Sequence, residues 1–271
     1  MSMNTGNVRT IIEKWYKKIG FDPCYDEEFY QALDTIPVEE GARVEEYDLT
    51  CQDGKRNFLY FLYFCENLER RYIERGMDTA LLYDNLTDLP RWLRTWSDLK
   101  GGLYLGELDW FIWHYRMKLF KLGRLQFNFN GAKFDAPKYG IKKGDPVIDM
   151  HIPACGPLLK EECEKSLEMA RWFFPKYFPD YEFSYFTCSS WLLAKELEEI
   201  LPEDSNILSF QKFYDIVSEE KRDSIISFVI RWQTKREDVA EIPVKTAFAQ
   251  KVQEMALAGE DFYVGHGVIR R

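Results

Sequence analysis

Asp149 and His151 have the types and spacing of side chains that could bind a metal ion. They stand two positions apart in PVIDMHIP, residues 146–153, whose apolar pattern predicts a strand, so both side chains point to one face. A carboxylate and an imidazole so placed can supply two ligands to Zn, Mn or Fe. A third ligand would have to come from elsewhere, and His266 could meet His151 across a sheet. The alternative is that His151 is a hydrogen-bonded histidine beside a turn.

The next residues, HIPACGPL (151–158), form a candidate anion site. A strand, a short turn and a helix in succession leave unpaired backbone N–H groups at the helix start, which favour a phosphate or pyrophosphate. Pro157 fixes the helix start but removes one donor. Glu161 and Glu162 already satisfy the helix dipole in the first turn. On these residues alone, an anion site and an ordinary strand-to-helix connection both stay open.

The secondary-structure elements that must position these residues fall into two parts of the sequence. The N-terminal part has the pattern of α-helices. Apolar residues recur there at helical spacing, with acids at helix starts and glycines at helix ends. The expected helices are 8–20, 26–36, 55–76, 89–102 and 107–120. These residues predict a helical N-terminal domain, 1–118.

From residue 119 onward strands and helices alternate. The expected strands are 119–130, 146–153, 183–193, 222–232 and 261–271, and the expected helices are 158–178, 205–217 and 243–260. The first two strands are expected to form an antiparallel hairpin. The fold class is therefore α+β, with a helical N-terminal domain followed by a mixed sheet flanked by helices, 119–271.

Charge and composition exclude several classes of function. The net charge of −9 argues against nucleic-acid binding and against adsorption to an anionic membrane. No signal-peptide pattern and no apolar run long enough to span a bilayer occur. The six cysteines show no metal-binding spacing, which indicates reduced thiols in a cytoplasmic protein.

The order of elements and two motifs resemble the later part of the acyl-CoA-dependent N-acyltransferase (GNAT) superfamily. The first motif is HIPACGPL, and the second is SNILSFQKFYDIV, residues 205–217, which is similar to the family's N-x-x-A-x-x-x-Y segment. The chain also resembles a group of bacterial acyltransferase-domain proteins with a helical N-terminal domain and a GNAT-like C-terminal domain. The family's loop has a basic residue and two glycines, whereas this loop has Gly156 and no neighbouring arginine. Phe213 stands at the position of the family's tyrosine, one residue before Tyr214.

The resemblance implies transfer of an acyl group from acetyl-CoA or another acyl-CoA to an amine on a small molecule or peptide. It implies that backbone around the loop and the second motif holds the coenzyme, through Ile152, Ala154, Cys155, Gly156, Leu158, Leu159 and Asn206. The base would be His151 or Glu182, and Tyr214 or Ser190 would stabilise or protonate the leaving thiolate. No metal is expected.

Two other functions stay open. A GNAT-like domain whose loop lacks an arginine and whose tyrosine is displaced could serve as a ligand-binding or interaction module without catalysis. A metal-dependent hydrolase using Asp149 and His151 is the third alternative. The sequence does not decide the acceptor, the acyl chain length or the oligomeric state, so a homodimer also stays open.

Overall fold

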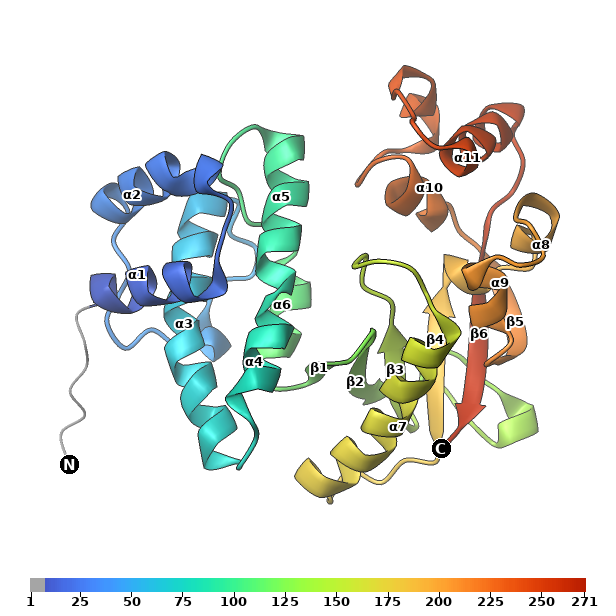
Figure 1. Ribbon diagram of the computed structural model, residues 1–271, viewed down its shortest axis with the longest axis horizontal. Helices are drawn as coiled ribbons and strands as arrows, with labels where there is room; N and C mark the ends of the chain where they lie inside the picture. Colours follow the sequence, from blue (N-terminus) through green and yellow to red (C-terminus); the bar gives the residue numbers. More distant parts are fainter. Residues whose placement is uncertain (1–7) are drawn as a thin grey trace. The chain divides into compact units, whose positions relative to one another are not determined.

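The computed structural model describes residues 8–271, and residues 1–7 of the expected helical domain lie outside the described part. The chain divides into two compact units, one ending at Lys121 and the other comprising Leu122–Arg271 (Figure 1). Within residues 8–271 no helix is both long and apolar enough to cross a membrane.

The first unit is helical, as predicted. Its helices are α1 (Val8–Ile19), α2 (Asp26–Thr35), α3 (Gly54–Glu74), α4 (Thr79–Leu86), α5 (Asp88–Lys100) and α6 (Leu108–Tyr115). The short helix α4 was not predicted. Helix α6 ends at Tyr115 rather than at residue 120, because Leu119 already belongs to a strand.

Helix α3 is the centre of this unit, and α1, α2, α4 and α6 all contact it. It begins where the Asp53 carboxylate accepts hydrogen bonds from the N–H groups of Lys55 and Arg56, which are otherwise unpaired in the first turn. The apolar stripe that predicted it, Phe58 to Leu68, is buried. Burial of this stripe, more than local propensity, makes a helix of this length stable.

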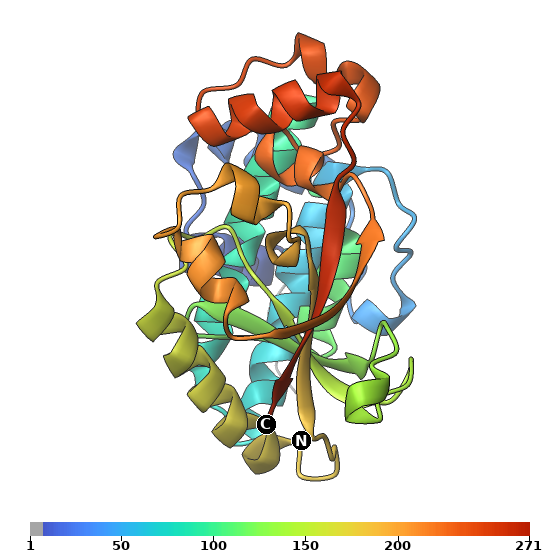
Figure 2. The ribbon, with the colours of Figure 1, turned by 90° about the vertical axis from the view of Figure 1, so that its right-hand side faces the viewer.

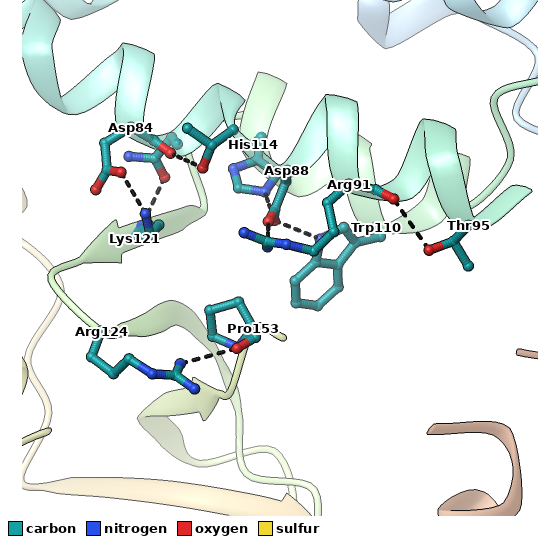
Figure 3. A network of polar contacts seen from close by, with 11 residues as sticks. Asp84, Asp88, Arg91, Thr95, Trp110, His114, Lys121, Arg124 and Pro153 are labelled. Carbon is teal, nitrogen blue, oxygen red and sulfur yellow. Dashed lines mark hydrogen bonds and ion pairs between the residues drawn. The ribbon is translucent and has the colours of Figure 1, made fainter. Parts of the chain in front are cut away.

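A buried carboxylate joins α5 to α6 (Figure 3). The Asp88 side chain is 2% exposed and accepts hydrogen bonds from Trp110 Nε1 at 3.2 Å and from His114 Nε2 at 3.0 Å. Arg91 completes the network with an ion pair to the same carboxylate. His114 therefore has a structural role in the first unit, since burial of Asp88 requires such partners.

A six-stranded mixed sheet begins at Leu119, and five of its strands lie wholly within the second unit (Figures 1 and 2). Its strands are β1 (Leu119–Leu122), β2 (Leu125–Gly131), β3 (Pro146–His151), β4 (Tyr185–Ser190), β5 (Asp215–Lys221) and β6 (Tyr263–Arg270). The spatial order is β1-β2-β3-β4-β6-β5. The pair β3–β4 is parallel, whereas β2–β3, β4–β6 and β5–β6 are antiparallel. The predicted mixed sheet and its antiparallel hairpin between β2 and β3 are confirmed.

Three predicted elements are wrong in detail. The single strand 119–130 is two strands, because Gly123 takes a φ of +73° and reverses the chain. The helix expected over 205–217 stops at Gln211, and Asp215 begins β5. The strand expected over 222–232 is instead a helix, α10 (Ser224–Val229). Strand β5 escaped prediction because an edge strand needs backbone pairing on one side only and tolerates a polar sequence, DIVSEEK.

The remaining helices are α7 (Lys160–Tyr177), α8 (Leu197–Ile200), α9 (Asn206–Gln211) and α11 (Ala247–Ala258). Helix α7 packs its aromatic side chains on one face of the sheet, where Phe174 lies 5.9 Å from Phe129 between ring centroids. Helices α8, α10 and α11 gather at the end of the sheet where β6 begins, around a separate apolar cluster (Figures 1 and 2).

Strand β6 passes so close to the end of β4 that only glycine fits at one position. A Cβ atom on Gly265 would lie 2.2 Å from the backbone oxygen of Leu193. Real Cβ atoms do not approach backbone so closely, so any side chain there forces the two segments apart.

We expect Gly265→Ala to lower the free energy of unfolding by about 1–3 kcal/mol, because it overpacks a fixed backbone contact. Thermal and urea denaturation measure the change. Ser218→Ala is the matched control, since Ser218 is exposed on the neighbouring strand, and it should change the free energy by less than about 0.5 kcal/mol. An unchanged stability of Gly265→Ala would contradict the close packing.

Candidate functional site

One face of the sheet carries polar side chains on four adjacent strands. Cross-strand pairing places Asn128 of β2 opposite Asp149 of β3, and Asp149 opposite Thr187 of β4. Two residues further along, Ser189 of β4 lies opposite His266 of β6. Because side chains alternate between faces along a strand, these residues share one side of the sheet.

Asp149 is the centre of this polar group. Its side chain is 2% exposed, and Thr187 Oγ1 donates a hydrogen bond to Asp149 Oδ1 over 3.3 Å. Asp149 Oδ2 forms an ion pair with Lys133 Nζ at 2.6 Å and lies 3.4 Å from His151 Nε2. The predicted pair Asp149 and His151 is therefore brought together on one face.

Strands β3 and β4 pair over a short distance. The parallel register joins Ile148 to Phe186 and Asp149 to Thr187, and β4 then continues as Cys188–Ser190 paired with β6. The strands therefore diverge just beyond Asp149 and Thr187. His151 lies on the diverging part of β3.

Tyr214 lies on the opposite face at the same point of divergence. Its hydroxyl donates a hydrogen bond to Met150 Sδ over 3.5 Å, and the Cys188 thiol is one of the groups that act on its pKa. Its ring packs so tightly on Gly267 that a Cβ there would lie 2.8 Å from a ring carbon. Burial raises the pKa of Tyr214 well above its ordinary value of 10.0, so the phenol stays protonated and can only be a proton donor at neutral pH.

Opposite faces of the sheet thus present groups with complementary chemistry. Asp149, next to the proton acceptor His151, is on one face of the sheet, and the next residue, Met150, is on the other. Met150 contacts the proton donor Tyr214, so acceptor and donor lie at the same level of the sheet on opposite faces. Such an arrangement can take a proton from one group and give a proton to another at the same position.

The loop after β3 is held by an arginine from a distant part of the sequence (Figure 3). Arg124, in the turn between β1 and β2, is 8% exposed, and its guanidinium donates to the carbonyl oxygens of Pro153, Gly156 and Pro157 at 3.0, 2.7 and 2.9 Å. Ser166 Oγ of α7 accepts a hydrogen bond from the Arg124 N–H. A planar guanidinium with five donors suits this task, because it can fix three carbonyl groups in one geometry.

The loop keeps donors for an anion. In the chain from residue 8 onward, no hydrogen bond uses the N–H groups of Gly156, Leu158 or Leu159, and no side chain caps α7 at Leu159. The Cys155 N–H is different, since it donates to the Pro153 oxygen at 2.8 Å. Gly156 takes a φ of +120°, which only glycine adopts without strain. Of the backbone donors predicted in the loop, Gly156, Leu158 and Leu159 are therefore available, and so is Ala154, whose N–H has no hydrogen bond among the described residues.

Comparison with known proteins follows the same division of the chain. The model of the family described as GNAT-like C-terminal domain matches residues 119–269. The chain belongs to this family. A search of curated proteins finds no match.

Solved structures similar to this GNAT-like protein are acyltransferases. An acyltransferase in complex with CoA and 10C-teicoplanin is 22% identical with a TM-score of 0.79, covering 96% of this chain and 87% of its own. An acyltransferase with decanoyl-CoA and teicoplanin is 24% identical with a TM-score of 0.72, over 97% and 85% of the two chains. One with decanoyl-CoA is 25% identical with a TM-score of 0.69, over 98% and 80%. The likeness shows that the fold extends over both units of the GNAT-like protein.

Three other predicted site residues do not join the group around Asp149. Ser190 Oγ accepts a hydrogen bond from the Leu192 N–H at 3.1 Å and so starts a short 3₁₀ turn. Asn206 is exposed at the first position of α9, behind the capping residue Ser205. Glu182 precedes β4, and because β3 and β4 are parallel it lies at the end of the sheet opposite His151. The geometry favours His151 over Glu182 as a base.

His266, the expected third metal ligand, is engaged elsewhere. Its Nδ1 lies 2.9 Å from Ser189 Oγ, and its ring stacks on Phe134 at 4.8 Å between centroids. Among residues 8–271 no group of three or more potential ligands could hold a metal ion. The cation beside Asp149 is the ammonium group of Lys133.

We expect Arg124→Lys to lower stability and to loosen the loop, because an ammonium group cannot hold three carbonyl groups at once. The loss should be about 1–3 kcal/mol. Hydrogen exchange of residues 153–160 should become faster in this variant. The control Lys143→Met changes an exposed residue in another loop and should leave this exchange unchanged. Equal protection in wild type and Arg124→Lys would contradict the role of Arg124.

A second prediction concerns pH. Burial lowers the pKa of His266 below its ordinary value of 6.5, so between the two values the unfolded chain binds this proton and the folded chain does not. The contribution to stability is therefore complete above pH 6.5 and is lost as the pH falls toward the folded pKa. NMR titration of the three histidines, with His266→Gln to assign the signal, should show one midpoint below 6.5. A His266 midpoint at or above that value would refute the assignment.

Proposed function

We propose that the GNAT-like protein transfers an acyl group from an acyl-CoA thioester to an amine. One observation carries this proposal: the His151–Asp149 pair and the neutral Tyr214 hydroxyl lie on opposite faces where β3 and β4 diverge. An acyl transfer to an amine needs both, because the amine must lose a proton and the leaving thiolate must gain one.

The coenzyme would be held at the start of α7. The N–H groups of Gly156, Leu158 and Leu159 have no hydrogen-bond partner within the described chain, and they stand at the positive end of the helix dipole. Arg124 draws three loop carbonyl oxygens toward itself and so fixes the loop before the ligand arrives. Solved relatives of the same fold contain CoA, octanoyl-CoA or decanoyl-CoA, which supports a thioester of this class as the donor.

In the reaction, the amine nitrogen attacks the thioester carbonyl carbon, the C–N bond forms and the C–S bond breaks. His151 accepts the proton from the amine, and Asp149 stabilises the resulting imidazolium from 3.4 Å. Tyr214 donates a proton to the departing sulfur. The acceptor is an amine on a small molecule or peptide, and the presence of teicoplanin in similar structures supports a bulky acceptor.

Thermal shift assays with CoA, acetyl-CoA, octanoyl-CoA and decanoyl-CoA test binding, and release of free thiol with a panel of amines tests transfer. We expect a thermal shift with each ligand. No shift with any of them at saturating concentration would overturn the proposal. Binding without transfer to any amine would instead support the module that binds ligand without catalysis.

Leu159→Asp tests the loop directly. Leu159 is the N-cap residue of α7 and is 40% exposed. An aspartate there caps the helix, which should preserve or raise stability by about 1 kcal/mol. Its charge repels pyrophosphate, so the thermal shift with acyl-CoA should disappear. The matched control Leu159→Asn caps without a charge and should keep a measurable shift, and equal binding by both variants would contradict a coenzyme at this helix start.

Tyr214→Phe should lower kcat by about 100-fold and leave KM for the thioester nearly unchanged, because it removes only the proton donor. His151→Gln should also lower kcat. Tyr83→Phe is the control, since that hydroxyl binds Glu69 within the first unit. A kcat for Tyr214→Phe equal to that of Tyr83→Phe would remove Tyr214 from the mechanism.

A further inference from the structure

The chain places an amine of its own beside the candidate base. Lys133 Nζ lies 2.6 Å from Asp149 Oδ2, the same oxygen that lies 3.4 Å from His151 Nε2. The Lys133 side chain is 45% exposed, whereas the Asp149 side chain is 2% exposed. In the proposed function an acceptor amine must reach His151, and Lys133 Nζ already lies at the carboxylate oxygen that is paired with this imidazole.

The backbone of Lys133 is held firmly although its side chain is not enclosed. Its neighbours Ala132 and Phe134 are buried in one apolar cluster with Val147 of β3 and Val268 of β6. The Ala132 N–H donates to the Asp145 oxygen, and its carbonyl accepts from Gly144, both at 2.9 Å. The Nζ can therefore move by rotation of its own side chain while the loop stays in place.

The side-chain oxygen of Asn128, also on this face of the sheet, has no hydrogen-bond donor among the described residues. Asn128 is 3% exposed and lies directly opposite Asp149 in the β2–β3 pairing. A buried acceptor without a partner costs free energy, which a ligand with N–H groups would recover. Asp149 and Asn128 together thus suit an amine or ammonium group.

The charge of Lys133 reaches the point where the strands diverge. Burial, the largest effect, and Asp149 raise the pKa of the Cys188 thiol, and the positive charge of Lys133 partly offsets them.

We propose that Lys133 is an internal acceptor: when acyl-CoA is bound and no external amine is present, the enzyme acylates its own Lys133. This inference rests on the proposed function. Lys133 Nζ loses one ammonium proton to His151 and attacks the thioester carbonyl carbon. The nitrogen of the resulting tetrahedral centre releases one of its two protons to solvent and keeps the other as the amide N–H. The amide C–N bond forms, the C–S bond breaks, and the thiolate takes a proton from Tyr214. Acylated Lys133 has no positive charge, and its acyl chain fills the place beside His151 where an external amine would bind. The modified protein is therefore expected to be inactive toward external amines.

The test is peptide mass spectrometry after incubation of the full chain with decanoyl-CoA and no acceptor. Lys143, exposed in the same β2–β3 connection, reports uncatalysed acylation by the thioester. We expect acylation of Lys133 to exceed that of Lys143 by more than about tenfold, because Lys133 is held at the base. His151→Gln should reduce labelling of Lys133 to the level of Lys143, and Lys133→Arg should abolish acceptor-free release of CoA.

The outcomes separate the two proposals. A thermal shift with decanoyl-CoA together with equal labelling of Lys133 and Lys143 would overturn self-acylation and leave the proposed function intact. Labelling of Lys133 that is unchanged in His151→Gln would show uncatalysed chemistry and would also overturn it. Absence of any thermal shift would overturn both. The melting temperature of each variant without ligand shows that it is folded.

Discussion

The short parallel pairing between β3 and β4 is the constraint on which the candidate site depends. It joins two residue pairs only, Ile148 with Phe186 and Asp149 with Thr187, before β4 continues alongside β6. Where two neighbouring strands separate, side chains from both faces of the sheet can reach the gap between the strands. Asp149 and His151 come from one face, and Tyr214 reaches the same gap through Met150 on the other. A fully paired sheet would keep these two groups apart.

Arg124 performs an indirect task in this arrangement. In a loop that binds an anion, an arginine could contact the anion itself, but this guanidinium contacts three backbone carbonyl oxygens. The N–H groups of Ala154 and Leu158 point away from Arg124, because each lies on the opposite edge of its peptide plane from the Pro153 or Pro157 oxygen. The Gly156–Pro157 unit has no N–H group. The arginine therefore organises the donors of the loop without taking one of their positions.

The sequence predicted those parts of the fold whose patterns are strong and local. Strand β3, helix α7 and strand β6 are buried elements with clear periodicity, and the pair Asp149 and His151 stands within one of them. Strand β5 has no such pattern because it lies at the sheet edge. Arg124 and Lys133 were missed for a different reason: both lie in turns, and only the pairing of strands brings them to the loop and to Asp149. A lysine near a glycine-rich turn reads as a solvated residue unless the topology is known.

The placement of donor and acceptor groups on opposite faces has a consequence for the order of events. Under the proposed function, a thioester bound beside Tyr214 would leave room for an amine beside His151, so the two substrates would not compete for one place. Both would be present together in a ternary complex, and the steady-state rate law for transfer to an external amine would be sequential. Initial rates measured at several fixed concentrations of one substrate would give intersecting reciprocal plots rather than parallel ones.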